Sequence, residues 1–348
     1  MAKLSNPSQV LERNLALFDN KRVLVAGFSD DHFIDLLAKS GATQVMGYGH
    51  DYHNHLVAKK SLDSSNAELQ FGAYYDNGDH QPWQQLILYW PKAKQRALYY
   101  LANLLPHLED NAEIYLVGDN KGGIKSSVKQ LKDYCDDGIK LDSARHCSLI
   151  QATYTHQAPI FDKNKWLKQY QVDAADIKLN VISLPGVFSH GELDLGTQLL
   201  LENIGHVKMK RTLDFGCGSG VIGSFIGVKR AGIPIELVDI DALAIESATL
   251  TLAANNVQGK VYPSDGFSDI TGKFATIISN PPFHTGIRTD YTVPEQFMSS
   301  APKQLMDGGQ LRIVANKFLR YEPIIEKYFA KLELVADTTK FKILSART

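Results

Sequence analysis

The strongest constraint on the fold is the alternation of short apolar runs with amphipathic segments over residues 212–348. Runs such as TLDFG (212–216) and ATIIS (275–279) are typical of buried strands, and segments with helical spacing follow them. This repetition predicts a parallel sheet with helices on both faces. At the end, LELVADT (332–338) and KFKILSA (340–346) have no helix between them. They predict an antiparallel hairpin at one edge of an otherwise parallel sheet.

The first half of the chain repeats this order in outline. RVLVAG (22–27) corresponds to RTLDFG (211–216), and LILYWPK (86–92) corresponds to IISNPPF (277–283). We infer an ancient duplication whose first copy lost its chemistry, with two unrelated α/β domains as the alternative. The expected units are residues 1–170 and 171–348. Residues 151–195 are expected to hold the linker between them and the lead-in to the second unit.

Charge and cysteine content narrow the possible partners. The net charge of the 348 residues is -1, so any contact with nucleic acid must come from a local basic patch. The three cysteines are too few and too irregularly spaced for a disulfide framework or a zinc site. The N-terminus lacks a signal-peptide core, and no run of about 18 apolar residues occurs. We expect a cytoplasmic, monomeric protein without a metal ion or a membrane span.

A glycine-rich turn follows the strand TLDFG. LDFGCGSGVIG (213–223) places Gly216, Gly218 and Gly220 where strand gives way to helix. Glycines there allow positive φ and close approach of the backbone to a ligand. Asp239 ends the next strand, where an acid can bind ribose hydroxyls. The pattern leaves three possibilities open: an adenosine cofactor, NAD through the G-x-G-x-x-G of residues 218–223, and a tight turn without a ligand.

Two features favour S-adenosylmethionine over NAD. Asp214 precedes the loop, where its carboxylate can anchor a cationic amino-acid end and would repel a pyrophosphate. The expected terminal hairpin also differs from the usual dinucleotide fold. Asp265, which follows the third strand, could accept a hydrogen bond from the adenine amino group; a helix cap or turn is the alternative.

The second chemical motif is the abrupt end of a strand at Asn280-Pro281-Pro282-Phe283. Open α/β sheets bind ligands at the carboxyl ends of their strands. The prolines remove N–H donors and leave carbonyl acceptors, and the Asn280 side-chain oxygen also accepts. Two acceptors fit the planar NH2 of a base or an amide, and Phe283 can stack on a flat ring. The motif therefore predicts methyl transfer to an amino nitrogen, with the acceptors stabilising the transition state.

Several further residues are candidates for substrate contact. His284 could relay a proton, although a structural histidine is an equal alternative. Arg288 and Lys317 could meet phosphates, with solvated surface as the alternative. The segment 118–132 is the most basic stretch of the first half and a candidate RNA contact, or else an exposed helix face. Its lysines are Lys121, Lys125, Lys129 and Lys132.

The motifs DFGCGSG, VDI and SNPPFHTG, with GGQLRIVANKFLRYEP and TTKFKILSA, resemble the bacterial small-subunit rRNA guanine-N2 methyltransferases of the RsmC type. The resemblance covers the whole chain and is densest from LPGVFSHGELDLGTQLLLE (184–202) onward. It implies two tandem Rossmann-like domains of the class I S-adenosylmethionine-dependent methyltransferase fold. Each would hold a mostly parallel seven-stranded sheet with a terminal antiparallel hairpin. Only the second domain would bind the cofactor.

The resemblance also implies residues and a substrate. Phe188, Asp194 and Gly196 are expected to line the cofactor or base pocket. The substrate would be a guanine of 16S rRNA, methylated on its exocyclic N2 in the small ribosomal subunit or an assembly intermediate. The first half should be inert, because LVAGFSDDH (24–32) lacks the glycine pattern and Trp-Pro-Lys stands in place of Asn-Pro-Pro.

Other functions stay open on the sequence alone. The same chemistry could act on 23S rRNA of the large subunit. A glutamine amide of a protein fits the same acceptors, although tyrosine is more typical after the prolines in such enzymes. DNA adenine methylation usually brings a separate target-recognition domain. A dehydrogenase and a non-catalytic RNA-binding assembly factor are the alternatives from other classes.

Overall fold

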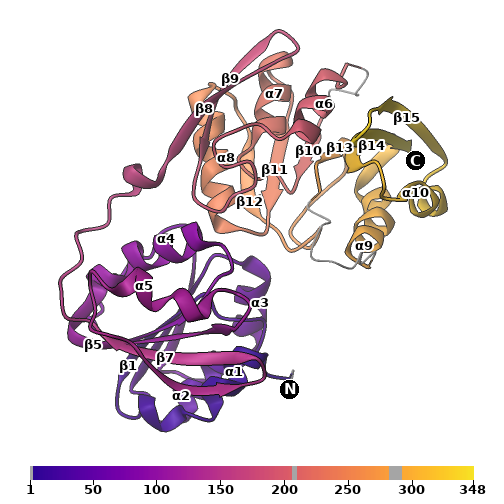
Figure 1. Ribbon diagram of the computed structural model, residues 1–348. Coiled ribbons are helices and arrows are strands. Elements are labelled where there is room, and N and C mark those ends of the chain that lie inside the picture. The colour runs from indigo at the N-terminus through magenta and orange to yellow at the C-terminus, as the bar shows by residue number, and fades with distance from the viewer. Residues whose placement is uncertain (1–2, 206–209, 282–291) are drawn as a thin grey trace. The chain divides into compact units, whose positions relative to one another are not determined.

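The computed structural model describes residues 3–205, 210–281 and 292–348 (Figure 1). Contacts divide the chain into two compact units, residues 1–166 and 167–348, here called the N-terminal and C-terminal units. The division falls a few residues before the boundary that we expected after residue 170.

Each unit is built around one seven-stranded sheet. In the N-terminal unit the strand order is β3 (Ala67–Phe71), β2 (Gln44–Gly49), β1 (Arg22–Ala26), β4 (Trp83–Tyr89), β5 (Leu108–Asp119), β7 (Cys147–Thr153) and β6 (Ile139–Ala144). In the C-terminal unit it is β12 (Lys260–Pro263), β11 (Ile235–Asp239), β10 (Thr212–Phe215), β13 (Phe274–Ser279), β14 (Leu305–Asn316), β16 (Phe341–Arg347) and β15 (Lys331–Asp337).

The two sheets have the same topology. In each, the first five strands of this order pair in parallel and the last two pair antiparallel. The predicted fold class is confirmed, including the terminal hairpin. The identical order also supports the duplication inferred from the sequence.

Helices cover both faces of each sheet. Those of the N-terminal unit are α1 (Asn6–Glu12), α2 (Phe33–Lys39), α3 (Tyr52–Ser61), α4 (Lys94–Leu104) and α5 (Val128–Leu131). Those of the C-terminal unit are α6 (Leu195–Glu202), α7 (Val221–Lys229), α8 (Ala242–Ala254), α9 (Thr292–Ser300) and α10 (Glu322–Tyr328). Short 3-10 turns lie at Leu15–Phe18, Leu105–His107, Ile124–Ser126, Lys163–Trp166 and Ala301–Gln304.

The apolar strand runs reflect this double coverage. In β13, Ile277 packs into the core shared with α9 and α10, whereas Ile278 packs into the core shared with α6, α7 and α8. Both side chains are fully buried. A strand buried on both faces has no polar face, so its sequence is continuously apolar rather than alternating.

A two-stranded hairpin of β8 (Lys168–Ala174) and β9 (Ile177–Ser183) leads into the C-terminal sheet. We expected only a linker and a lead-in there. Side chains of α8 hold the hairpin by bonding the backbone of residues 180–184. Three backbone N–H groups donate to these side chains: Asn180 N to Asn255 Oδ1 at 2.9 Å, Ile182 N to Thr251 Oγ1 at 3.0 Å, and Leu184 N to Ser247 Oγ at 3.0 Å. Their spacing of four residues along one helix face is a signal that the sequence contained.

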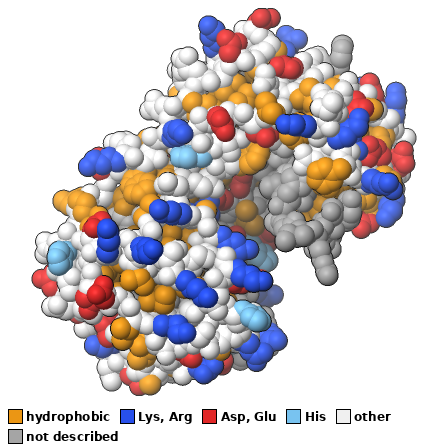
Figure 2. Space-filling view, viewed as in Figure 1, with side chains coloured by type: hydrophobic (Ala, Val, Ile, Leu, Met, Phe, Trp, Pro, Cys, Tyr) orange, Lys and Arg blue, Asp and Glu red, His pale blue; other side chains and the backbone are white. Residues whose placement is uncertain are grey.

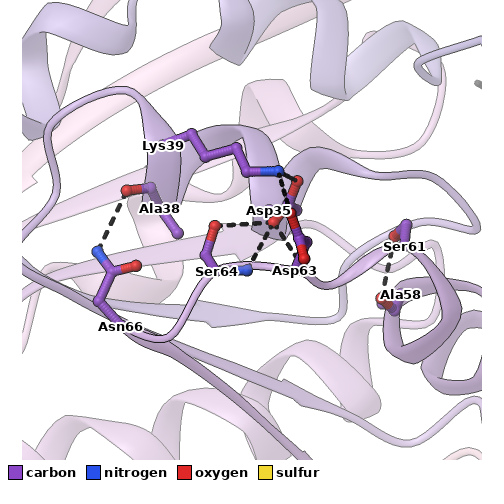
Figure 3. Close-up of polar contacts among 8 residues, drawn as sticks. All are labelled: Asp35, Ala38, Lys39, Ala58, Ser61, Asp63, Ser64 and Asn66. Atoms are coloured by element: carbon purple, nitrogen blue, oxygen red, sulfur yellow. Dashed lines mark hydrogen bonds and ion pairs between the residues drawn. The ribbon is translucent and has the colours of Figure 1, made fainter.

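The N-terminal unit contains a well-satisfied buried acid, Asp35 of α2 (Figure 3). Its Oδ1 accepts from Asp63 N at 3.0 Å and from Ser64 N and Oγ at 3.1 and 2.8 Å, while Lys39 Nζ lies 2.7 Å from Oδ2. Burial raises the pKa of Asp35, but these partners outweigh it and lower the pKa to about 2. Asp35 thus ties α2 to the segment after α3.

A membrane span, a metal site or a disulfide would each require a recognisable feature among the described residues. Across the described ranges, none of the helices has the length and apolar character needed to cross a membrane. Nor do these ranges hold a cluster of three or more His, Cys, Asp and Glu side chains that could bind a metal ion. Cys135, Cys147 and Cys217 are all free and buried.

Candidate active site

The two chemical motifs of the sequence meet at one edge of the C-terminal sheet. The glycine loop, residues 216–220, follows β10, and Asn280 follows β13. These strands are parallel neighbours, with Asp214 opposite Ile278. Their carboxyl ends therefore present both loops at the same edge, where α/β sheets bind ligands.

The glycine loop has the backbone that the sequence predicted. Gly216, Gly218 and Gly220 have φ of 66°, 53° and 74°, in the left-handed region that strains other residues. A Cβ on Gly220 would lie 2.9 Å from the Cα of Ala248, so this glycine also lets α7 approach α8 closely. Around Gly218, the nearest atom to such a Cβ is 4.0 Å away, on Phe188. The loop at Gly218 therefore has open space beside it.

Asp214 lies in β10, two residues before this loop, and is fully buried. Its Oδ2 accepts from Gly223 N at 2.8 Å, in the first turn of α7. Its Oδ1 is buried without a hydrogen-bond partner among the described residues. Burial raises the pKa of Asp214 to about 7, with the charge of Asp239 adding to the rise. Asp214 therefore joins β10 to the first turn of α7, and its direct contact with a cofactor stays a prediction.

Asp239, at the end of β11, ties the next strand to the loop. Its Oδ2 accepts from Gly218 N at 2.9 Å and its Oδ1 from Asp241 N at 3.0 Å. Burial, with the charge of Asp241, raises the pKa of Asp239 to about 6. Asp265 is half-buried just after β12, whose Pro263 is the register partner of Asp239. The three acids thus lie at or just beyond the carboxyl ends of three adjacent strands, while their ligand contacts stay predictions.

Asn280 is held from one side by the start of α6. Its Nδ2 donates to Asp194 Oδ2 at 3.0 Å and to Thr197 Oγ1 at 2.8 Å. Asp194 is the N-cap of α6 and also accepts from Thr197 N at 2.9 Å. Both hydrogens of the amide are thereby used, which leaves Oδ1 as its acceptor for a ligand. Thr197 was not among the residues predicted from the sequence, although an Asp followed three residues later by a Thr is visible at residues 194–197.

Two cavities adjoin Asn280. One, of about 180 Å³, is lined by Phe188, Asp194, Asn280 and Pro281 together with the end of β14, Leu319, Tyr321 and Phe341. The other, of about 30 Å³, lies against the glycine loop. Phe188 and Asn280 line both, and the Phe188 side chain is 55% exposed. Asn280 therefore stands where a ligand on the loop would adjoin a ligand in the larger cavity.

Gly196 is not among the residues that line these two cavities, and its place in the cofactor or base pocket stays a prediction. A Cβ there would lie 2.9 Å from Asp194 Oδ2 and 3.2 Å from Cε1 of Phe341. The glycine makes room for the carboxylate oxygen that holds Asn280.

The remaining predicted residues are placed as follows. Pro282, Phe283, His284 and Arg288 lie outside the described residues. The Lys317 ammonium is paired with the Asp337 carboxylate, so a phosphate would have to compete with that acid. Lys121 and Lys125 are exposed on the N-terminal unit, while Ile124 between them is buried. Their contact with RNA stays a prediction.

The N-terminal unit has a larger cavity, of about 710 Å³, at the equivalent strand ends. Strand register shows what lines these positions. Val25 pairs with Ile87 as Asp214 pairs with Ile278, so Tyr89 stands where Asn280 stands in the C-terminal unit. Our prediction that Trp-Pro-Lys replaces Asn-Pro-Pro was therefore wrong by one residue. Asp51, Asn54 and Asp119 line this cavity, but the positions equivalent to Asp214 and Asn280 hold Val25 and Tyr89.

Comparison with known proteins gives the same two-part division. The methyltransferase small domain matches residues 178–345, and the methyltransferase small domain N-terminal matches residues 8–170. Proteins named ribosomal RNA small subunit methyltransferase C from Psychromonas ingrahamii and Aeromonas hydrophila are each 43% identical to this chain. The matches cover 99% and 98% of it, and 97% of each relative. The chain belongs to the ribosomal RNA small subunit methyltransferase C family.

A solved structure supports the fold of this family member. It is described as a T. thermophilus 16S rRNA N2 G1207 methyltransferase (RsmC) in complex with AdoMet and guanosine. The TM-score is 0.81 at 22% identity, and the match covers 94% of this chain and 88% of the other. The family recognised from the glycine loop and the Asn-Pro-Pro-Phe motif is thus confirmed, and membership of a methyltransferase family argues against a dehydrogenase.

Proposed function

We propose that this chain transfers a methyl group from S-adenosylmethionine to the exocyclic N2 of a guanine in 16S rRNA, within the small ribosomal subunit or an assembly intermediate. The observation that carries the proposal is the Asn280 amide. Its Nδ2 is held by α6, and its Oδ1 is left for a ligand beside the glycine loop. The names of the relatives and the guanosine in the T. thermophilus complex support this substrate.

The residues of the loop fit S-adenosylmethionine. The unpartnered Oδ1 of Asp214 is a buried acceptor, and buried acceptors are nearly always paired in complete structures. A cationic amino-acid end, directly or through water, would supply that donor. Asp239 and Asp265 would hold the ribose and the adenine, with Gly216, Gly218, Gly220 and Phe188 around them. When bound, the cofactor supplies a methyl group on a positively charged sulfur.

Asn280 would act on the nucleophile. The N2 lone pair of guanine is delocalised into the ring, so the amino group is a poor nucleophile. A hydrogen bond from N2–H to Oδ1 favours a pyramidal nitrogen and stabilises the positive charge that grows as the methyl arrives. The Pro281 carbonyl is the second acceptor that the sequence suggested. Positioning would supply the rest of the effect. Methyl transfer would leave the cofactor as a neutral thioether and would place an extra proton on N2. That proton is acidic enough to pass to water, so no strongly basic side chain is required.

The larger cavity beside Asn280 suits a planar base. Phe188, Phe341 and Pro281 give it apolar walls on which a ring can stack. A base inside a helix must leave its stack to enter such a cavity, which costs a few kcal/mol. Phe283 is a further stacking candidate from the sequence and lies outside the described residues.

The N-terminal unit would support RNA binding without catalysis. Figure 2 shows basic side chains interspersed with acidic and hydrophobic ones on its visible face, which favours a local contact over a broad basic surface. Lys125 and Lys140 line a surface hollow of about 380 Å³ near the predicted basic segment. We expect the enzyme to work as a monomer in the cytoplasm, where small subunits are assembled.

The test uses the purified full chain with labelled S-adenosylmethionine. It is offered small subunits, large subunits, free 16S rRNA and a release-factor protein, all from a strain lacking this gene. Label recovered as N2-methylguanine only in small subunits or 16S rRNA is the expected result. Label in the large subunit or in protein would keep the Asn280 chemistry and discard the substrate. No label together with no cofactor binding would overturn the cofactor assignment.

A further inference from the structure

The side-chain amide of Asn280 can in principle point either way. A half-turn of the amide exchanges oxygen and nitrogen with almost no change of shape. One orientation offers an acceptor to the cavity and the other offers a donor. Only the acceptor orientation can take a hydrogen bond from the amino group of a base, so activity requires a device that selects it.

Asp194 supplies this selection. Its carboxylate Oδ2 lies 3.0 Å from Asn280 Nδ2, and a carboxylate only accepts. In the flipped amide, Asn280 Oδ1 would face that oxygen with no hydrogen between them. Thr197 cannot select alone, because its hydroxyl at 2.8 Å can either accept or donate. Asp194 therefore sets the orientation, and Thr197 takes the second hydrogen.

The start of α6 holds Asp194 Oδ2 in place. The same oxygen accepts from Thr197 N at 2.9 Å as the N-cap of the helix. Gly196 leaves it the space that a Cβ would occupy. One oxygen thus joins the helix cap to the amide at the end of β13, and the geometry of the amide depends on the first turn of α6.

The N-terminal unit has the same helix start with a hydroxyl at the position of the Asp194 carboxylate, while the Asp31 carboxylate there accepts from the backbone N of Ser5 at 2.9 Å. There α1 begins at the N-cap Ser5, whose Oγ accepts from Ser8 N at 3.4 Å. Ser8 Oγ in turn lies 2.8 Å from the hydroxyl of Tyr89, the residue at the position of Asn280. Ser5 and Ser8 correspond to Asp194 and Thr197. The Ser5 hydroxyl is enough to cap α1, so capping alone does not require a carboxylate. The carboxylate of Asp194 is found at the cap that also contacts the Asn280 amide.

We propose that Asp194 and Thr197 are positioning residues for methyl transfer: they lock the Asn280 amide so that Oδ1 faces the target nitrogen. The negative charge of Asp194 also polarises the amide through its N–H, which makes Oδ1 a stronger acceptor as positive charge grows on that nitrogen. This inference deepens the function proposed above and rests on it.

Three variants separate the cap, the orientation and the charge. Asp194→Ser keeps a capping hydroxyl like that of Ser5 but loses the acceptor-only contact with Asn280. Asp194→Asn keeps an oxygen at the position of Oδ2 and removes the charge. Thr197→Val keeps the backbone N–H for the cap and removes the hydroxyl. Each is compared with wild type for kcat, for KM toward the RNA, for cofactor Kd and for thermal stability.

We expect kcat to fall about 100-fold in Asp194→Ser and about 10-fold in Asp194→Asn and Thr197→Val, the scale of losing or weakening one transition-state hydrogen bond. The cofactor Kd and the KM toward the RNA should stay within about three-fold of wild type, because the lost interaction stabilises the transition state and not the bound substrates. The matched control is Ser5→Ala, which removes the equivalent cap in the N-terminal unit and should leave kcat unchanged. If Asp194 serves only as a cap, Asp194→Ser will have wild-type kcat, and the proposal is wrong.

A double-mutant cycle with Asn280→Ala tests whether Asp194 acts through the amide. In the Asn280→Ala background, Asp194→Ser should cause no further loss of residual activity. Independent, multiplicative losses would show that Asp194 acts elsewhere and would overturn the proposal. Activity is measured on whichever acceptor the wild-type chain labels. A wrong substrate assignment is then seen with the wild type, separately from a wrong role for Asp194.

Discussion

The N-terminal and C-terminal units have the same strand order and differ in the side chains at the strand ends. Val25, Gly49 and Tyr89 of the first unit stand at the register positions of Asp214, Asp239 and Asn280 in the second. Both units have a capped helix before the first strand of their sheet, α1 with Ser5 and α6 with Asp194 as the N-cap. The scaffold and the site are therefore separable, because a unit can keep its whole sheet while valine, glycine and tyrosine stand where the other unit has two acids and an amide.

Two buried acids show the same contrast. Asp35 of the N-terminal unit accepts from three protein donors and pairs with Lys39, and its pKa falls to about 2. Asp214 of the C-terminal unit has one N–H donor and an unpartnered oxygen, and burial raises its pKa to about 7. A satisfied acid stabilises the fold, whereas an unsatisfied one costs stability until a ligand supplies the donor. The difference distinguishes a structural acid from a candidate binding residue.

The largest expected effect is at the paired positions Asn280 and Tyr89. Asn280→Ala should lower kcat by at least about 100- to 1,000-fold and leave cofactor Kd within a few-fold, since only the transition-state acceptor is lost. Tyr89→Ala should leave kcat unchanged and destabilise the N-terminal unit by about 3–5 kcal/mol, because a buried ring is removed. Single-turnover kinetics and denaturant unfolding measure both. Normal activity of Asn280→Ala would refute the acceptor mechanism.

Separating the units should divide binding from turnover. Residues 167–348 should bind S-adenosylmethionine with a Kd close to that of the full chain but methylate small subunits at least about 10-fold more slowly, since substrate support is lost. Residues 1–166 should bind no cofactor, because Gly49 replaces the ribose acid. Calorimetry with each fragment checks this. Full activity of the second fragment would mean that the first is not a substrate platform.

The two units should respond to pH in opposite directions. Asp214 and Asp239 have folded pKa values of about 7 and about 6, above the ordinary 3.8. The folded C-terminal unit therefore binds protons more tightly than the unfolded chain, and its free energy of unfolding should fall as pH rises from about 4 to 7. Burial lowers the pKa of His50 in the N-terminal unit, so that unit should gain stability as pH rises toward about 6.5.

Thermal melting of the separated units from pH 4.5 to 8 measures these trends. The cofactor should raise the Tm of the C-terminal unit more at pH 8 than at pH 5.5, because a cationic ligand prefers ionised carboxylates. Asp214→Asn keeps an acceptor for Gly223 N and should flatten the pH dependence. Parallel pH profiles for the two units would contradict the raised pKa values of Asp214 and Asp239 or the lowered pKa of His50.

The smallest expected effect is at Gly196. A Cβ there would press on Asp194 Oδ2 from 2.9 Å, so Gly196→Ala should lower kcat a few-fold, up to about 10-fold, through Asn280. Stability should change by less than about 1 kcal/mol, since alanine favours helix while the close contact opposes it. Gly205→Ala is the control, because a Cβ there meets nothing within 4 Å. Equal kcat for both variants would show that Oδ2 can shift without consequence.

Several structural features were predictable because they depend on neighbours in the sequence. The β-α alternation, the terminal hairpin and the glycine turn arise from local periodicity and from the backbone freedom of glycine. The acceptor character of Asn280 and Pro281 follows from their own chemistry. These features appear in the structure at β10, β13, β15 and β16. The resemblance that named the family also rests on such short motifs.

Other features depend on residues that are far apart in the chain. Thr197 reaches Asn280 across 83 residues and Asp194 reaches it across 86, so no local pattern relates them. The hairpin of β8 and β9 is held by α8 through Asn180 and Asn255, 75 residues apart. Strand register supports the match of Tyr89 to Asn280 that the correspondence of residues 86–92 with 277–283 implies.

The sequence by itself determined the two α/β units, the family, the glycine loop and the residues with the right chemistry. Only the tertiary structure shows that the Asn280 amide nitrogen meets Asp194 and Thr197, that Asp214 is joined to the first turn of α7, and that Gly196 lies against Asp194 Oδ2. The physical reason is that residue type sets which bonds a side chain can make. Folding then determines which of those bonds are already satisfied, and the unsatisfied ones are left for the ligand.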